Sequence, residues 1–327
     1  MNILITGIHG FIGSNLVAAL KAQHTIYGLD IVAPPKEGVV KTFSWNELES
    51  IPAVDVVIHL AGKAHDTKNQ TNAQVYFEIN TGLTQKIYDW FLKSEAQKFI
   101  FFSSVKAAAD KVEGEILTEN VIPSPKGPYG ESKIKAEEYI LSRQSAVGSQ
   151  QSRAKSQEPR EIDELSTKNR TYILRPCMIH GPGNKGNLNL LYQVVKKRIP
   201  YPLGAFENRR SFTSIDNLSF VIEQLIEKDV AGGIYNVGDD ESLSTNELIS
   251  LMAWIMGKPD RIWKWNKSLV LFAAKIGTVF HLPLNTERLQ KLTENYVVSN
   301  AKLKKALGID MMPVRAEEGL RKTINSL

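Results

Sequence analysis

Three side chains have the types and the spacing of a group that removes a proton from a hydroxyl. Tyr129 and Lys133 are four residues apart, which places both side chains on one face of a helix. An ammonium beside a phenol favours the phenolate, so we expect Tyr129 to act as a base well below its free pKa of about 10. Ser104 precedes the tyrosine by 25 residues (129 − 104 = 25) and can hydrogen-bond the reacting oxygen.

A glycine-rich turn near the N-terminus predicts a site for a dinucleotide. A β-branched and apolar run is followed by Gly7, Gly10 and Gly13, and then by apolar residues at helical spacing. Gly7 permits a tight turn, Gly10 lets the backbone approach a pyrophosphate, and Gly13 lets the helix pack closely on the strand. We expect the pyrophosphate to lie on the free N–H groups of the helix N-terminus, at Phe11 and Ile12.

The second strand of this unit is expected over residues 25–29 and leads into Asp30. This aspartate lies 20 residues past Gly10 (30 − 10 = 20), the distance at which a carboxylate hydrogen-bonds the adenosine ribose. Because a carboxylate there repels a 2′-phosphate, the sequence favours NAD over NADP. The alternative is a glycine-rich surface turn with an unrelated aspartate, and the strand–turn–helix context argues against it.

Together with Ser104, Tyr129 and Lys133, the GxxGxxG turn resembles the extended short-chain dehydrogenase/reductase family of nucleotide-sugar epimerases, dehydratases and reductases. The resemblance runs nearly end to end and rests on the order and spacing of several motifs. It is strongest to bacterial polysaccharide-locus members that act on UDP-N-acetyl sugars, and it implies a UDP-sugar substrate, bound NAD and a homodimer. Further residues that it assigns to the cofactor site are Leu60, Ala61, Gly62, Asn80 and Pro176.

The same resemblance points to four residues for the substrate. The segment that begins at Arg210 resembles the one that holds the nucleotide diphosphate, and guanidinium forks match phosphate oxygens. Where epimerases often place an asparagine on that diphosphate, this chain has Met178, and we expect Asn187 to replace it. Lys106 follows Ser104 by two residues and is expected to contact the loop or the substrate, with proton transfer as the alternative.

The residues leave two reactions open. Ser104 is followed by Val105 and Lys106, whereas the family's dehydratases have an acidic pair there, so dehydration is disfavoured. A 4-epimerase of a UDP-hexose or UDP-N-acetylhexosamine needs only the three catalytic residues and tightly held NAD, and passes through a transient 4-keto sugar. A reductase of a UDP-4-keto-6-deoxy sugar would use the same residues and consume NAD(P)H. We favour the epimerase. A non-catalytic NAD sensor would have a broken triad, and this triad is intact.

Strands alternate with helices up to about residue 176, which predicts an α/β fold with a doubly wound parallel Rossmann sheet. Residues 177–327 are irregular, and we expect a smaller, mixed domain that caps the substrate. By resemblance, segments near 211–236 return to the first domain. Residues 144–169 are rich in Ser, Gln and charge, and we expect a flexible insertion there, either without function or as a partner-binding segment.

The composition fits a cytoplasmic enzyme. The 327 residues are 43% apolar, enough for one or two cores, and the net charge of +5 suits an anionic substrate. The lone Cys177 excludes an internal disulfide and indicates a reducing compartment. Met1 leads directly into a strand without a basic n-region, so we expect no signal peptide. The basic residues are spread along helices, and we expect neither a nucleic-acid partner nor a metal site.

The longest apolar stretch covers residues 268–280. It contains Lys275 and is too short to span a bilayer, so we expect no stable membrane insertion. Residues 261–265, with the sequence RIWKW, come directly before it. We expect a cap helix packed on its own domain, and a membrane-surface element is the alternative.

Overall fold

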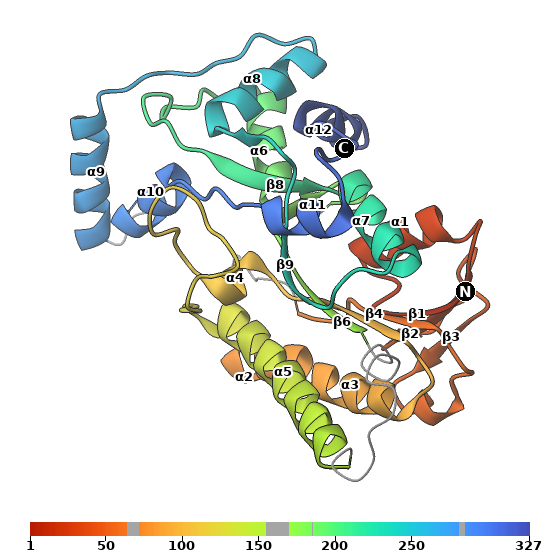
Figure 1. The fold of residues 1–327 in the computed structure, drawn as a ribbon. Helices are drawn as coiled ribbons and strands as arrows, with labels where there is room; N and C mark the ends of the chain where they lie inside the picture. Colours follow the sequence, from red (N-terminus) through yellow and green to blue (C-terminus); the bar gives the residue numbers. More distant parts are fainter. Residues whose placement is uncertain (64–71, 155–169, 185, 281–284) are drawn as a thin grey trace.

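The computed structural model describes residues 1–63, 72–154, 170–184, 186–280 and 285–327. Its largest part is a seven-stranded sheet with the order β3-β2-β1-β4-β5-β6-β9, in which each strand is parallel to its neighbours (Figure 1). The order of the first six strands is that of dinucleotide-binding doubly wound folds. The strands are β1 (Asn2–Thr6), β2 (Thr25–Asp30), β3 (Lys41–Ser44), β4 (Val56–His59), β5 (Lys98–Phe102), β6 (Arg170–Pro176) and β9 (Gly233–Val237).

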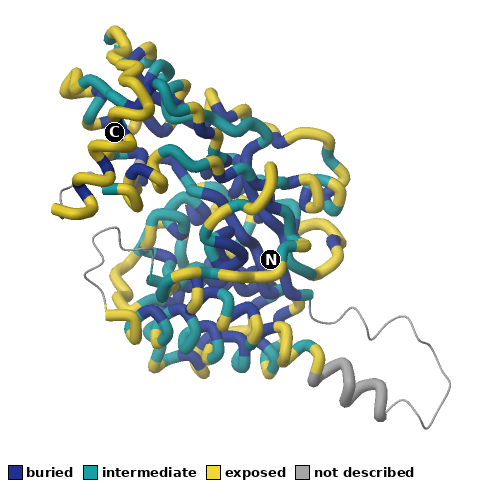
Figure 2. Tube along the Cα trace, turned by 90° about the vertical axis from the view of Figure 1, so that its left-hand side faces the viewer, coloured by how far each residue is buried: buried dark blue, intermediate teal, exposed yellow. Residues whose placement is uncertain are grey.

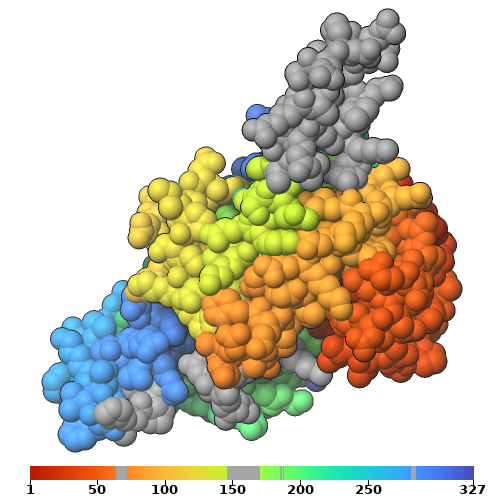
Figure 3. Space-filling view, turned by 90° about the horizontal axis from the view of Figure 1, so that it is seen from below, coloured from red at the N-terminus to blue at the C-terminus, as the bar shows by residue number. Residues whose placement is uncertain are grey.

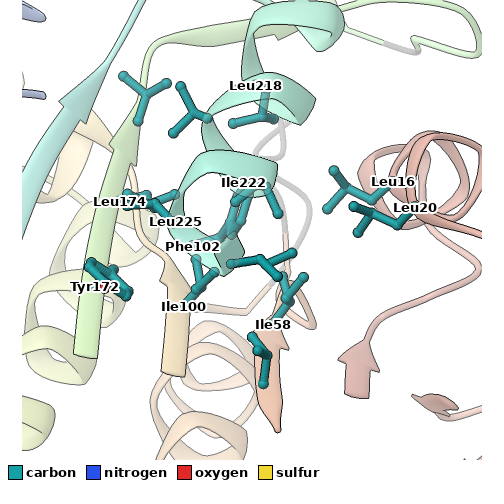
Figure 4. Packing of buried hydrophobic residues seen from close by; sticks show 14 of the residues in the cluster. Leu16, Leu20, Ile58, Ile100, Phe102, Tyr172, Leu174, Leu218, Ile222 and Leu225 are labelled. Carbon is teal, nitrogen blue, oxygen red and sulfur yellow. The ribbon is translucent and has the colours of Figure 1, made fainter. Parts of the chain in front are cut away.

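Both faces of this sheet are buried, which is why its strands are continuous apolar runs. Successive side chains of a strand point to opposite faces. In β1, Ile3 and Ile5 join one core and Leu4 joins the other. The first core contains Leu16 of helix α1 (Phe11–Leu20) and Leu218 of helix α7 (Ile215–Glu227), which meet the sheet in Figure 4.

Helices from distant parts of the chain cover the two faces. The first face is covered by α1 (Phe11–Leu20), α7 (Ile215–Glu227) and α11 (Ala301–Leu307), all of which contribute to its core. The second face is covered by α3 (Leu83–Lys93) and α5 (Pro128–Ala154). Short segments complete this part: η1 (Leu48–Ser50), α2 (Ala73–Tyr76), the π-helical turn η2 (Phe77–Gly82) and α4 (Val105–Ala108).

A smaller part is built from the C-terminal half of the chain. Its sheet has the order β10-β8-β7, with β10 antiparallel and β7 parallel to β8. Figure 2 shows that buried residues concentrate in the centre of the molecule, while the outer helices are largely exposed. The elements are β7 (Met178–His180), α6 (Asn187–Lys196), β8 (Arg210–Ser214), β10 (Ser242–Leu243), α8 (Thr245–Ile255), α9 (Lys267–Val279), α10 (Thr286–Thr293) and α12 (Ala316–Asn325).

The predicted fold class is confirmed: a doubly wound parallel sheet is joined to a smaller mixed sheet. The chain returns to the large sheet through α7 and β9, and again through α11 near its end. The division of the chain at residue 176 stays a prediction. Within the described residues, none of the helices is long and apolar enough to cross a membrane.

The structure differs from expectation at residues 144–154, where α5 continues as a helix to Ala154. This stretch has no apolar stripe, but extending an existing helix costs far less than nucleating one, and Gln, Ala and Arg are adequate helix formers. The remainder of the expected insertion, residues 155–169, lies outside the described residues.

A buried ion pair joins α5 to the sheet. The guanidinium of Arg175 on β6 donates from Nε to Glu137 Oε1 at 3.0 Å and from Nη2 to Oε2 at 2.6 Å. The two side chains are 2% and 0% exposed. Ser103, just after β5, donates its hydroxyl to the same carboxylate. Such a pair offsets its desolvation cost only when its geometry is good and its remaining hydrogen bonds are made, and both conditions hold here.

Replacing Arg175 with Met should lower the free energy of unfolding by about 3–5 kcal/mol, because it leaves the Glu137 carboxylate buried without its cation. Urea unfolding at neutral pH, followed by circular dichroism, measures this. Glu37→Gln is the matched control, since it breaks an ion pair of the same 2.6 Å length to Lys21 in which the carboxylate is 89% exposed. We expect almost no shift for the control. Equal midpoints for the two variants would contradict the prediction.

Candidate active site

Predicted cofactor and catalytic residues gather at one edge of the large sheet. The glycine turn follows β1, Leu60 follows β4, Ser104 follows β5, and Pro176 ends β6 as a buried residue. Because these strands are parallel, their carboxyl ends share this edge, where open α/β sheets bind ligands. The fold therefore brings together segments that are more than a hundred residues apart in the sequence.

The glycine turn has the backbone that a close approach requires. Gly7 has a φ of +68°, and a Cβ on it would lie 2.9 Å from the Ala61 nitrogen. A Cβ on Gly13 would lie 2.6 Å from the Gly7 carbonyl oxygen and 2.7 Å from Ile8, so only glycine lets α1 start this close to β1. Gly10 is the exposed N-terminal cap of α1, and Phe11 and Ile12 open the helix. Their N–H groups have no partner within the helix, which suits a pyrophosphate.

Asp30 lies beside this turn at the end of β2. Its Oδ2 accepts the His9 N–H at 3.0 Å and its Oδ1 accepts the Ile31 N–H at 2.8 Å. The carboxylate therefore also holds the turn in shape, a contact that sequence reasoning missed. Its place at the strand end fits a ribose, and the ribose contact itself stays a prediction.

The loop after β4 is held by a chain of buried hydrogen bonds. Ala61 N–H donates to Thr6 Oγ1 at 3.0 Å, and Thr6 Oγ1 lies 2.7 Å from His59 Nδ1. His59 Nε2 lies 2.9 Å from Thr84 Oγ1, whose hydroxyl donates to the Asn80 carbonyl at 2.6 Å. Since Thr84 has already used its proton, His59 must donate from Nε2 and accept at Nδ1. Burial lowers the pKa of His59 far below its usual value, so the ring is neutral.

Asn80 supports this loop from the π-helical turn η2. Its Oδ1 accepts the Lys63 N–H at 2.7 Å, and its Nδ2 donates to the Lys63 carbonyl at 3.2 Å and to Ser132 Oγ at 2.9 Å. A Cβ on Gly62 would lie 2.9 Å from Asn80 Oδ1. The structure thus gives Asn80 a positioning role, and its assignment to direct cofactor contact stays a prediction.

Ser104 and Tyr129 meet at the start of two helices. Ser104 is 7% exposed and caps α4, accepting the Lys106 N–H at 3.2 Å. Tyr129 is the second residue of α5, is half-buried, and forms a side-chain hydrogen bond with Ser104. A Cβ on Gly130 would lie 2.5 Å from the Lys106 carbonyl oxygen, so this glycine lets α5 reach α4.

Lys133 lies one helical turn further on, 5% exposed, with Nζ donating to the Phe102 carbonyl at 2.8 Å. Burial lowers its pKa to about 8, and the Glu137 carboxylate opposes that shift. Burial raises the pKa of Tyr129, while the hydrogen bond to Ser104 works against this. The expectation that Lys133 brings the tyrosine pKa below its free value is therefore wrong for the protein alone. The Lys133 ammonium is directed at a backbone carbonyl of β5, and desolvation is the largest effect on the pKa of the Tyr129 phenol.

Arg210 and Lys106 form a positive pole on the other side of the site. Lys106 Nζ lies 4.4 Å above the Tyr296 ring and donates to the Asp110 carbonyl at 2.7 Å. The backbone of Arg210 pairs with that of Tyr296 in an isolated parallel β-bridge. The Arg210 side chain donates from Nη2 to the Lys291 carbonyl. Its Nε is buried and has no hydrogen-bond partner in the described structure.

Burial lowers the pKa of both Lys106 and Arg210. The Asp110 and Glu294 carboxylates oppose this shift for Lys106, and Glu294 opposes it for Arg210. These two cations suit a diphosphate, because the Arg210 Nε–H donor is still unpaired.

The other two substrate residues are less informative. Met178 opens β7, is half-buried and pairs with Phe212 of β8. It packs against the apolar core of the smaller part. Asn187 is the first residue of α6, and its side chain lies outside the described part of the chain. Both assignments stay predictions.

Sequence reasoning missed the buried charges beneath the catalytic lysine. Glu137 follows Lys133 by four residues, as Lys133 follows Tyr129, so all three side chains lie along one face of α5. That spacing was a readable signal. Its partner Arg175 is a charged residue inside an apolar strand, which is a second signal for a buried pair.

The residues present fit NAD. The turn admits no Cβ at Gly7 or Gly13, the N-terminus of α1 offers N–H groups to a pyrophosphate, and Asp30 stands at the end of the neighbouring strand. Gly7, Gly10, Phe11, Ile12 and Gly13 would hold the phosphates.

Comparison with known proteins agrees with this geometry. The chain is 28% identical to the UDP-glucose 4-epimerase of Vibrio cholerae, over 98% of this chain and 94% of that protein. It is 27% identical to the N-acetyl-α-D-glucosaminyl-diphospho-ditrans,octacis-undecaprenol 4-epimerase of Escherichia coli O157:H7, over 76% and 70%. The structure of MoeE5 in complex with UDP-glucuronic acid and NAD superposes with a TM-score of 0.74 at 19% identity, covering 100% and 98% of the two chains. Residues 3–238 match the model of the NAD dependent epimerase/dehydratase family. The chain therefore belongs to this family of NAD-dependent enzymes.

Proposed function

We propose that this protein is a 4-epimerase of a UDP-hexose or UDP-N-acetylhexosamine that passes through a transient 4-keto sugar. The observation that carries the proposal is the hydrogen-bonded pair of Ser104 and Tyr129, one turn from buried Lys133, at the carboxyl edge of a dinucleotide-binding sheet. The names of the two relatives, both 4-epimerases, support the same reaction.

In this mechanism Tyr129 takes the proton of the sugar's 4-hydroxyl. Ser104 donates its hydroxyl to the same oxygen and shares the developing charge. Lys133, with a pKa of about 8, is mostly protonated at neutral pH and places a positive charge one turn along the helix. Bound NAD supplies a hydride acceptor and, in its oxidised form, a second positive charge that favours the phenolate. The 4-keto sugar would then turn over within the site, where return of the same hydride to the other face of C4 and return of the proton from Tyr129 to the oxygen would complete the epimerisation.

The substrate's diphosphate is assigned to Arg210 and Lys106. The unpaired Nε of Arg210 supports this assignment, because a buried guanidinium donor without a partner is costly and a phosphate oxygen would satisfy it. Hydride can return to the other face only if the hexose rotates within the site. Binding through the diphosphate at this fixed place leaves the hexose free to do so.

Anaerobic incubation with UDP-sugars tests the proposal. We expect interconversion of the C4 epimers with no net change in NADH absorbance. Stoichiometric loss of NADH with a UDP-4-keto-6-deoxy sugar would replace the epimerase with the 4-keto reductase, which uses the same three residues.

A sugar joined through its diphosphate to a lipid is a second candidate substrate. One relative carries such a substrate in its name. The observation that favours it here is the exposed apolar face of α9, which packs next to α10 and hence close to Arg210. A lipid-diphosphate N-acetylhexosamine in detergent, used beside the UDP-sugars, separates the two candidates.

A cytoplasmic location and a homodimer are also proposed. Buried Cys177, with a thiol pKa raised by burial, suits a reducing compartment but does not require one.

Tyr129→Phe keeps the ring and its packing and removes only the hydroxyl. We expect the turnover number to fall by about two to four decades, the range for loss of a positioned base, with bound NAD unchanged. Steady-state kinetics and the NAD content of the purified variant measure both. If more than about a tenth of the activity remained, Tyr129 would not be the base, and Lys106 would be tested next.

Ser104→Ala should move the acidic limb of the pH profile to higher pH. The hydrogen bond to Ser104 lowers the pKa of Tyr129, so its loss raises that pKa and the phenolate forms at a higher pH. The pH dependence of kcat/KM measures the shift. An unchanged limb, or one that moved to lower pH, would mean that Tyr129 is not the group that titrates.

Asp30→Asn should reduce the ratio of the affinity for NAD to the affinity for NADP. The amide oxygen can still accept the His9 N–H from the turn, whereas the bond from the Ile31 N–H is lost, and the charge that repels a 2′-phosphate is gone. Loss of a charged hydrogen bond to the ribose is expected to weaken NAD by about one to two decades, with NADP unchanged or tighter. Calorimetric titration with both cofactors measures this, and equal losses would remove Asp30 from the ribose site.

Arg210→Gln should raise the KM for the UDP-sugar by about one to two decades with a much smaller effect on kcat, because it removes a charge-assisted contact to the diphosphate. Its neighbour Arg209 is the control, because that side chain is 61% exposed and its ion pair is a long surface one, with Nη2 3.9 Å from Glu247 Oε1. Arg209→Gln should leave KM unchanged. Similar KM values for the two variants would argue against the assigned diphosphate site.

A further inference from the structure

Helix α9 carries an apolar face that the described protein does not cover. Only Val270, Ala274 and Gly277 are buried on this helix, and the first two pack with Leu203 and Leu289. These three residues follow at spacings of four and three, which is one narrow stripe. Figure 1 shows α9 at one end of the molecule, separated from the large sheet, and the light-blue part of the chain also lies at one end in Figure 3.

The opposite side of α9 is also apolar. Leu269, Phe272, Ile276 and Val279 follow at spacings of three, four and three residues and so form a second stripe on the outward side. Their exposed fractions are 69%, 63%, 38% and 71%. A surface helix normally directs its apolar stripe inward, and a contiguous exposed one marks an interaction site.

Aromatic side chains extend this stripe at both ends. Trp263 and Trp265, just before the helix, are 50% and 54% exposed and stack with a centroid distance of 6.3 Å. Phe280, just after it, is 70% exposed. Trp is enriched where a protein meets the interface of a bilayer, because its ring is apolar and its N–H is polar. We call the outward stripe and these three aromatic residues the α9 face.

The charged residues within residues 261–286, the segment that contains the α9 face, are all basic. Arg261, Lys264, Lys267 and Lys275 are exposed, and the sequence from 261 to 286 contains no aspartate or glutamate. In a symmetric dimer through this face, the cations of the two copies would lie on the same small interface and repel each other. An anionic, partly apolar surface satisfies both the charges and the apolar stripe.

We propose that the α9 face docks this protein on the anionic surface of a lipid bilayer. The helix would lie in the plane of the interface, with Leu269, Phe272, Ile276 and Val279 among the acyl chains and the lysines at the headgroups. Peripheral docking agrees with the absence of a membrane-crossing helix from the described residues. It does not depend on the proposed reaction.

Docking would bring the predicted diphosphate site to the membrane surface. Helix α10 packs against α9, and its Lys291 carbonyl accepts the Arg210 guanidinium. A sugar diphosphate at the bilayer surface would therefore be one helix away from the α9 face.

Sedimentation of the full-length protein with vesicles tests the proposal. We expect binding to vesicles of phosphatidylcholine with phosphatidylglycerol, weaker binding to phosphatidylcholine alone, and loss of binding at high salt. Trp emission should shift to shorter wavelength on binding. Failure to bind either vesicle would overturn the proposal without touching the epimerase, which is assayed with soluble UDP-sugars.

Paired variants locate the binding. The double variant Leu269→Ser, Phe272→Ser should weaken vesicle binding by about tenfold or more. The single variant Lys264→Gln should weaken it by about fivefold, the contribution of one lysine at an anionic surface. Ile122→Ser is the control, because Ile122 is 87% exposed and lies outside the α9 face. All four side chains are exposed, so the thermal midpoint and the epimerase rate should not change.

Equal binding by the control and the α9 variants would overturn the proposal. So would a dimer in light scattering without lipid that Phe272→Ser dissociates, since the α9 face would then belong to a second copy of the chain.

Discussion

The buried pair of Glu137 and Arg175 fixes the geometry on which the catalytic residues depend. Glu137 is on the helix that carries Tyr129 and Lys133, and Arg175 is on a central strand of the sheet. The bidentate contact, with Ser103 as a third partner, sets the position of α5 along the strands. An apolar contact would tolerate sliding, whereas two charges buried together require one register. The carboxylate also acts on Lys133, opposing the fall in its pKa that burial causes.

A second constraint links the nucleotide loop to the same helix. Hydrogen bonds run from Ala61 through Thr6, His59 and Thr84 to Asn80, and Asn80 donates onward to Ser132. Ser132 in turn donates to the Tyr129 carbonyl at 2.9 Å. Every polar group in this path is satisfied by the next one, so the path rigidifies the edge of the sheet rather than weakening it. The loop beneath the cofactor and the proposed base are thereby held in one frame.

The outer half of the site has a different character. Lys106 and Arg210 rest on Tyr296, and their positive charges are only partly matched by neighbouring groups. Inner residues are positioned by fully paired networks, and outer residues retain donor capacity for an anion. This division fits the proposed reaction, in which the outer residues would bind the substrate's diphosphate. Docking through the α9 face, as proposed, would bring this outer half close to a membrane, because α10 packs against α9 and contacts Arg210.

The sequence determined the parts of this protein that depend on local chemistry. Glycines at 7, 10 and 13 after an apolar run identified the dinucleotide turn, because a Cβ at Gly7 or Gly13 would collide with backbone. The spacing of Tyr129 and Lys133 identified one helix face, and the alternation of strands and helices identified the parallel sheet. These signals are readable because each involves neighbours along the chain.

Only the tertiary structure decided the properties that depend on residues far apart in sequence. Spacing suggested that Lys133 would lower the pKa of Tyr129, but burial raised it, because desolvation is set by everything packed around a group. Asn80 resembled a cofactor ligand, and the structure shows in addition that its amide contacts Lys63 and Ser132, which the sequence did not reveal. The outward stripe of α9 has the larger apolar side chains, and only the packing of Val270 and Ala274 against Leu203 and Leu289 determines that the outward stripe is left exposed.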